Sequence, residues 1–158
     1  KTNKQVPKVN RLFESRSKQF TLPHLIHNSL EDAYDEIELL GFPVSTSNFD
    51  MLRTSFRGEI LASDMDNMVG RKVRMVGLLV TIKYVKTVRK ELMHFGTFLD
   101  VTGELFDTTH FPDSLHRYPF RGHGVYLILG KVVTEFGYAS IEVEKLAKLS
   151  LQGDPREE

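Results

Sequence analysis

The chain has 158 residues and no cysteine; 41% of its residues are hydrophobic and 27% are charged, with 21 basic and 21 acidic residues. This length and composition are typical of one globular domain with a smaller appendage, and the lack of cysteine excludes a disulfide scaffold and thiolate metal sites. No apolar run approaches the roughly 20 residues of a membrane span, and no signal-peptide pattern opens the chain. We therefore expect a cytoplasmic protein without a membrane partner. Because the chain begins with Lys1, we also expect it to be part of a longer protein.

The balanced net charge hides a segregated pattern. Residues 71–90 include seven basic and no acidic side chains, whereas residues 31–38 include five acidic and no basic ones. A basic stretch indicates either an anionic partner or a solvated surface. Charge alone does not separate these two interpretations.

The first predicted helix covers residues 29–40. Ser29 is in the position of an N-cap with Asp32 three residues later, apolar residues follow at helical spacing, and Gly41 suits the left-handed residue after a helix. A second, shorter helix is predicted over residues 48–55. Asp64 and Asp66 are interpreted as part of a capped turn.

From Gly70 onward, β-branched and apolar runs predict strands. Gly77 lies inside the first strand, where a glycine often marks a bulge or a sharp curl. The predicted order is three strands, a short helix and two strands: 73–84, 93–99, 104–111, helix 112–118, 125–134 and 140–146.

This order predicts a mainly β protein with a five-stranded OB-fold Greek-key barrel, preceded by a small helical segment. We divide the chain into an irregular linker segment (1–28), a small helical segment (29–69), the OB-fold barrel (70–149) and a C-terminal tail (150–158).

Three stretches carry motifs beyond this pattern. Residues 35–45 contain Leu-Gly-Phe-x-x-Ser, residues 70–80 contain Gly-Arg-Lys-Val and Gly-Leu-Leu-Val, and residues 93–112 contain Phe-x-Asp-x-Thr-Gly followed by Phe-Pro. In this order they resemble the C-terminal region of the bacterial DNA polymerase III α subunit, over roughly residues 30–148. The stretch from Gly103 to Pro112 is one residue longer than in that family. Because strand faces alternate, which residues of 104–111 face outward stays open.

The resemblance implies a non-catalytic module of a replicative, DNA-directed DNA polymerase, a nucleotidyltransferase whose active site lies outside this chain. Such a module binds single-stranded DNA template with little sequence preference during DNA replication and needs no cofactor. Its partners are the rest of the polymerase chain and other replisome subunits. The resemblance also implies a contact of Leu12 and Phe13 with the sliding clamp, against the alternative of a loosely packed segment.

Two other functions stay open from the residues. The barrel is either a protein-docking module of the replisome or an OB domain of the kind that binds tRNA anticodons. The six histidines have neither cysteine nor carboxylate neighbours at ligand spacing, so no metal site is predicted.

OB barrels bind single strands between two loops, with basic residues near phosphates and aromatic residues on bases. The loop after the first strand is basic, and the loop between the last two strands contains two aromatic residues. The competing interpretation is that the cations are solvated and the aromatic residues pack the barrel end. The candidate nucleic-acid-binding residues are Arg74, Lys83, Tyr84, Lys86, Arg89, Lys90, Phe136 and Tyr138.

The remaining motif residues have structural interpretations. Asp100 and Thr102 are predicted to hold a turn through side-chain-to-backbone hydrogen bonds, and Gly103 to supply a positive φ. Four apolar residues are predicted to fill the barrel interior: Phe95, Phe98, Val101 and Phe111.

Overall fold

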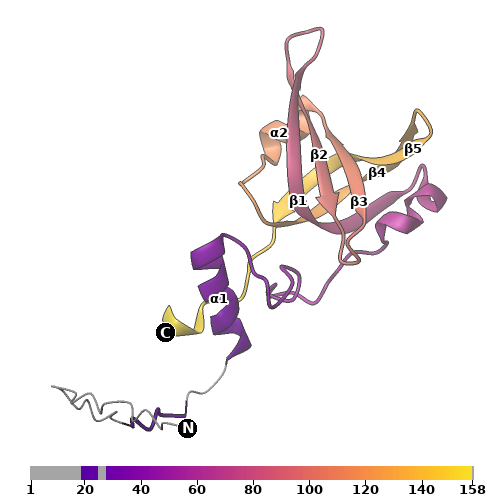
Figure 1. Cartoon of the computed structure of the whole chain (residues 1–158). Coiled ribbons are helices and arrows are strands. Elements are labelled where there is room, and N and C mark those ends of the chain that lie inside the picture. Colours follow the sequence, from indigo (N-terminus) through magenta and orange to yellow (C-terminus); the bar gives the residue numbers. More distant parts are fainter. Residues whose placement is uncertain (1–18, 25–27, 158) are drawn as a thin grey trace, which may run out of the picture.

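The computed structural model describes residues 19–24 and 28–157. Its strands form a closed barrel in the order β1-β2-β3-β5-β4, with β1 also paired to β4 (Figure 1). Every pair is antiparallel except β3 with β5. This is the topology of the OB-fold and confirms the predicted fold class. The strands are β1 (Lys72–Lys86), β2 (Leu92–Leu99), β3 (Leu105–His110), β4 (Val125–Glu135) and β5 (Tyr138–Lys148).

The described residues also form two α-helices and two 3₁₀ segments. They are α1 (Ser29–Leu40), the 3₁₀ helix η1 (Ala62–Met68), α2 (Pro112–Arg117) and the 3₁₀ turn η2 (Pro155–Glu157). In Figure 1, α1 lies below the barrel beside the C-terminal segment, and α2 lies between β3 and β4 in the chain. None of the helices in the described ranges is long and apolar enough to cross a membrane.

The ends of α1 follow local side-chain chemistry. The N-cap is Asn28 and not Ser29, because the Asn28 side chain accepts a hydrogen bond from the Leu30 N–H at 3.1 Å. Gly41 ends the helix with φ 87° and donates its N–H to the Ile37 carbonyl, as predicted.

The predicted helix over residues 48–55 is wrong. Ser47 Oγ accepts hydrogen bonds from the backbone N–H groups of Phe49 and Asp50, which form a turn. Leu52 then pairs with Leu151 in an isolated bridge. Phe49 and Leu52 are buried against the outside of β1 and β4, so tertiary packing and not helical periodicity decides this segment.

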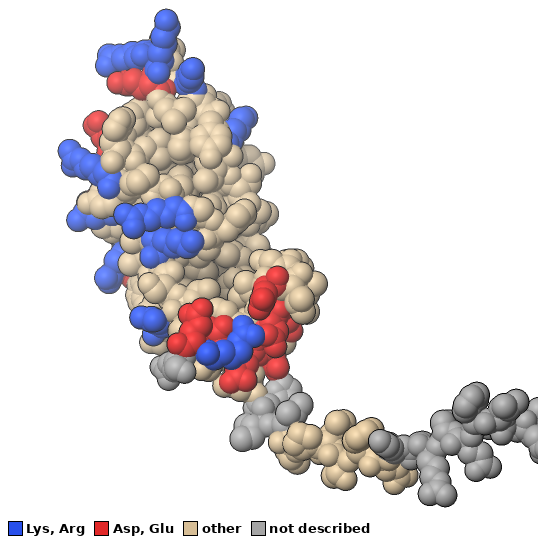
Figure 2. Space-filling model, turned by 90° about the vertical axis from the view of Figure 1, so that its left-hand side faces the viewer, with Lys and Arg blue, Asp and Glu red and all other residues tan. Residues whose placement is uncertain are grey.

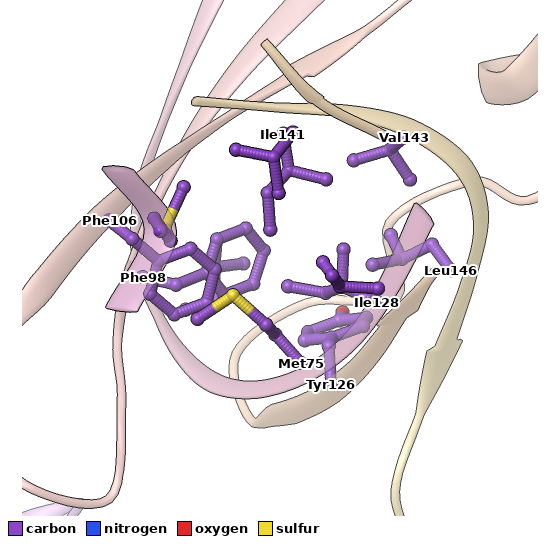
Figure 3. Packing of buried hydrophobic residues seen from close by; sticks show 12 residues of the cluster. Met75, Phe98, Phe106, Tyr126, Ile128, Ile141, Val143 and Leu146 are labelled. Atoms are coloured by element: carbon purple, nitrogen blue, oxygen red, sulfur yellow. The ribbon is translucent and has the colours of Figure 1, made fainter. Parts of the chain in front are cut away.

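The barrel interior is filled by buried apolar side chains from all five strands (Figure 3). Phe98 is fully buried and stacks with Phe106, their ring centroids 5.6 Å apart. Phe95, Val101 and Phe111 are exposed, so their predicted place in the core is wrong. Because faces alternate along a strand, burying Phe98 on β2 turns its odd-numbered neighbours outward.

Asp100 forms the predicted corner between β2 and β3. Its Oδ1 accepts hydrogen bonds from Thr102 N–H at 2.8 Å, Thr102 Oγ1 at 2.6 Å and Glu104 N–H at 3.0 Å, and Gly103 has φ 86°. Its Oδ2 also accepts from Ala62 N–H at 2.9 Å. The turn residue therefore joins the barrel to η1, a contact that local chemistry does not predict.

Gly77 has a packing function and does not mark a bulge. The register shift in β1 lies between Leu79 and Thr81, so of the two features expected at Gly77, a bulge or a sharp curl, the bulge is wrong. A Cβ atom at Gly77 would lie 2.7 Å from the Phe106 ring and 2.9 Å from Phe98 Cβ. Glycine is needed here because β1 passes directly over the aromatic core.

At Gly130 the backbones of β4 and β5 approach too closely to leave room for a side chain. A Cβ atom there would lie 2.3 Å from the Glu142 carbonyl oxygen, which belongs to paired backbone and cannot rotate away. Gly130→Ala should lower the free energy of unfolding by about 1–3 kcal/mol, measured by urea denaturation. Gly153→Ala is the matched control, since the nearest atom to a Cβ there would be 4.0 Å away. Equal effects of the two substitutions would contradict this account of the strand contact.

Candidate nucleic-acid interface

A groove crosses the outer face of the barrel where β1, β2 and β3 meet the β4–β5 hairpin. Its volume is about 410 Å³. The first three strands supply its floor, and the hairpin supplies one wall. The lining residues are Thr81, Lys83, Phe95, Thr97, Asp107, Thr109, Glu135, Phe136, Tyr138, Ala139 and Ser140.

The wall of the groove ends in a tight turn that presents two aromatic side chains. Glu135 pairs with Tyr138, and the two residues between them, Phe136 and Gly137, have φ 51° and 84°. Positive φ at both central residues is the pattern of a type I′ hairpin turn. Phe136 is 99% exposed and Tyr138 is 79% exposed. The competing interpretation, in which these two residues pack the barrel end, is therefore wrong, and their role in binding stays a prediction.

The floor of the groove carries a third aromatic residue and a polar pair. Phe95 on β2 is 37% exposed and faces outward, because Gly96 and Phe98 on the same strand face the interior. Thr97 Oγ1 donates a hydrogen bond to Asp107 Oδ1 at 2.7 Å. The face of β3 is thereby decided: Phe106 is buried and Asp107 faces the groove.

The charge of the groove lining is not strongly basic. Lys83 is its one cation, whereas Asp107 and Glu135 are acidic. Phosphates gain little from such a lining, and stacking on uncharged aromatic rings is the main interaction it offers.

The other cations of the first loop lie beyond the groove. Lys86, Arg89 and Lys90 are on or beside the tip of the β1–β2 hairpin, which projects from the barrel (Figure 1) and carries the cations at the top of Figure 2. Thr87 closes the tip: its carbonyl accepts from the Lys90 N–H at 2.8 Å, and its Oγ1 accepts from the Glu91 N–H at 3.1 Å. These cations are placed to meet a ligand only where it leaves the groove.

Two further candidates make contacts elsewhere. The Arg74 guanidinium pairs with Glu59 at 2.6 Å and lies over the Phe56 ring at 5.4 Å. Tyr84 packs edge-on against His94, with ring centroids 4.5 Å apart, and lines a different cavity. The structure therefore brings Lys83, Phe136 and Tyr138 together in the groove, but not Arg74 or Tyr84. The clamp candidates Leu12 and Phe13 lie outside the described residues.

The candidates that sequence reasoning missed lie on strand faces. Phe95, Thr97, Thr81 and Asp107 reach the groove through the alternation of β1, β2 and β3. A signal for Phe95 was present: a buried Phe98 requires positions 95 and 97 to face out. No local signal identifies Asp107, because the face of β3 depends on its pairing with β2.

Among the described residues, no three His, Cys, Asp or Glu side chains come together as metal ligands.

Comparisons with known proteins add little beyond the fold. No protein-family model matches the chain, and no curated protein matches it. Two solved structures are similar in part. One is the OBody AM1L10 bound to hen egg-white lysozyme, with 15% identity and a TM-score of 0.49 over 63% of this chain and 98% of that chain. The other is the second OB-fold domain of replication protein A from Methanococcus maripaludis, with 15% identity and a TM-score of 0.39 over 54% of this chain and 92% of that chain. At such low identity and TM-scores neither assigns a function, and the fold assignment rests on the strand order and register above.

Proposed function

We propose that this chain binds single-stranded nucleic acid in the groove between the β1–β3 face and the β4–β5 hairpin. The observation that carries the proposal is the meeting of three exposed aromatic side chains, Phe95, Phe136 and Tyr138, in one groove. Stacking of a base on an aromatic ring contributes about 1–3 kcal/mol and tolerates any base, since every base has a π face. This supports binding with little sequence preference.

The charges favour a particular orientation of the strand. With Asp107 and Glu135 in the groove lining, bases occupy the groove and phosphates face solvent. Lys83 meets the strand within the groove, and the cations at the β1–β2 tip meet it as it leaves. Each phosphate contact adds about 0.7 to the slope of log affinity against log salt for a single strand.

We further propose that the strand is DNA template and that this module belongs to a DNA polymerase III α-type subunit. The support is the resemblance of residues 35–45, 70–80 and 93–112 to that family. The polymerase active site is then outside this chain, and the rest of the polymerase and other replisome subunits are its partners. Primer extension by the full-length protein should become less processive when the groove aromatic residues are removed.

Binding of fluorescent oligothymidylate, measured by anisotropy at two salt concentrations, tests the groove directly. The wild-type chain should bind with micromolar affinity that falls with salt. Asp107→Asn should bind about threefold more tightly at low salt, because a unit charge about 7 Å from a phosphate costs about 0.6 kcal/mol in water. The amide oxygen of the substituted side chain would still accept the Thr97 hydrogen bond, so the floor of the groove should persist.

The control for Asp107→Asn is Asp66→Asn, which removes the same charge from an exposed residue outside the groove. An equal gain from both substitutions would attribute the effect to net charge and remove Asp107 from the binding site. Absence of wild-type binding at low salt would leave a protein-docking function. Tighter binding of oligouridylate than of oligothymidylate would favour the anticodon-binding type of OB domain.

A further inference from the structure

A second cavity lies at the other end of the β4–β5 hairpin from the groove. It lies between the connection from α2 to β4 and the end of β5, and its volume is about 370 Å³. Its seven lining residues include three basic and no acidic side chains. The seven residues are Arg117, Tyr118, Pro119, Arg121, Leu146, Ala147 and Lys148.

The three cations of this pocket have no carboxylate partner among the described residues. The ion pairs that join described residues use Lys72, Arg74 and Arg156 as their cations. Figure 2 looks onto the left side of Figure 1, where α2 lies, and shows Lys and Arg side chains gathered in the middle of this face. The largest group of acidic side chains on this face lies lower down. The basic charge of the pocket is therefore available to an external anion.

The backbone that carries these cations is held in place by buried chemistry. The Tyr126 hydroxyl accepts a hydrogen bond from the Arg121 N–H at 2.8 Å and donates to the Gly122 carbonyl at 2.6 Å. Tyr126 is itself fully buried in the barrel core. Lys148 Nζ donates to the Arg121 carbonyl at 3.2 Å, and its side chain lies over Gly124, where a Cβ atom would be 2.6 Å from Lys148 Cε. Because this backbone is already held in place, less conformational entropy is lost when a ligand binds.

We propose that this pocket binds phosphate groups, and that a nucleic-acid strand long enough to extend beyond the groove supplies them. The inference rests on the proposed function, since the strand is the one that occupies the groove. Tyr138 in the groove and Lys148 in the pocket are the two ends of β5, which has 11 residues and spans roughly 35 Å if extended. Arginine suits this role because its guanidinium forms paired hydrogen bonds with phosphate oxygens.

The test compares two oligothymidylates, one of about 5 nucleotides that fills an OB groove and one of about 20 that extends past it. Arg117→Ala/Arg121→Ala should leave the affinity for the short oligonucleotide unchanged and weaken that for the long one several-fold. The salt slope for the long oligonucleotide should fall by about 1.4, the value for two phosphate contacts on a single strand. The matched control is Arg71→Ala/Lys131→Ala, which removes two cations from residues that line neither surface.

A second arm titrates pyrophosphate against the full chain and follows the Gly122 amide by NMR. A shift in the wild type that is lost in Arg117→Ala/Arg121→Ala supports phosphate binding in the pocket. If that shift occurs while the long oligonucleotide binds both proteins equally, the pocket takes a free phosphate ligand and the strand path is overturned. If the substitutions leave the affinity for the long oligonucleotide unchanged and pyrophosphate does not shift the Gly122 amide of the wild type, the proposal is overturned as a whole. Wild-type protein that binds neither oligonucleotide would instead refute the proposed function, and the pyrophosphate arm would still decide the pocket.

Discussion

Replacing Phe136 and Tyr138 together with Ala should weaken oligothymidylate binding by at least about 2 kcal/mol, or about 30-fold, measured by anisotropy. Each ring offers a stacking surface worth about 1–3 kcal/mol per base. Both side chains are largely exposed at the end of the β4–β5 hairpin, so their removal should not disturb the core. The far-UV and thermal unfolding signals should therefore stay close to those of the wild type.

Phe42→Ala is the matched control, because Phe42 is an exposed phenylalanine outside the groove lining. It should bind like the wild type. Loss of affinity in both proteins would show that exposed aromatic surface of any kind suffices, and would contradict stacking in the groove.

A substitution at Phe136 should change stability and oligonucleotide affinity in opposite directions. Its φ of 51° is unfavourable for a bulky residue, whereas Asn followed by Gly is a preferred pair in type I′ turns. Phe136→Asn should therefore raise the free energy of unfolding by about 1 kcal/mol while lowering the affinity for oligothymidylate. A stability loss together with the affinity loss would mean that the ring packs against the barrel and is not held outward for a ligand.

Mild acid should destabilise the fold through two neighbouring histidines, the buried His110 and the half-buried His94. His110 on β3 is fully buried, and its register partner on β2 is His94. Thr108 Oγ1 donates to the Gly96 carbonyl at 3.0 Å and lies 2.9 Å from His110 Nε2, so His110 Nε2–H donates to Thr108. His110 Nδ1 and both ring nitrogens of His94 have no partner among the described residues. Both imidazoles are therefore held in their neutral form.

Burial lowers the pKa of His110 from 6.5 to about 3, and the nearby His94 adds to this shift; burial also lowers the pKa of His94. Between pH 6.5 and 3 the unfolded chain binds a proton at His110 that the folded chain does not bind. Stability must therefore fall as pH falls through this range. At about pH 5 the free energy of unfolding should be lower than at about pH 7 by about 2 kcal/mol, since each pH unit below about 6.5 lowers it by about 1.4 kcal/mol.

Urea unfolding at about pH 7 and about pH 5 measures this effect before carboxylates contribute. Asp100 and Glu59 also have lowered pKa values, but an acid of this kind loses its stabilising effect only below its unfolded pKa of about 4. His110→Gln keeps a donor for Thr108 and does not titrate, so most of the pH dependence should disappear. His116→Gln, at an exposed histidine of α2, should leave it unchanged. An unaltered pH dependence in His110→Gln would show that protonation of His110 does not cause the loss of stability in mild acid.

Local chemistry makes several elements readable from the sequence alone. Gly41 ends α1, Pro112 begins α2, and Asp100 holds the β2–β3 corner, because each acts on backbone groups within a few residues of itself. The succession of strands and helices along the chain follows from apolar and β-branched runs separated by turn residues, and this succession is typical of an OB-fold. The exposed Phe136 belongs to the same class, since the tip of a two-residue hairpin loop must lie in solvent.

Tertiary structure alone decides which side chains share a surface. The pairing of β2 with β3 turns Asp107 to the groove and Phe106 to the core, and burial of Phe98 sends Phe95 outward. Arg74 looks like any other cation of its stretch until the fold brings Glu59 beside it. Arg117, Arg121 and Lys148 come from separate segments and meet only when α2, its connection to β4 and β5 pack together. Barrel closure depends on hydrogen bonds between distant residues, and local periodicity contains no information about which distant residues those are.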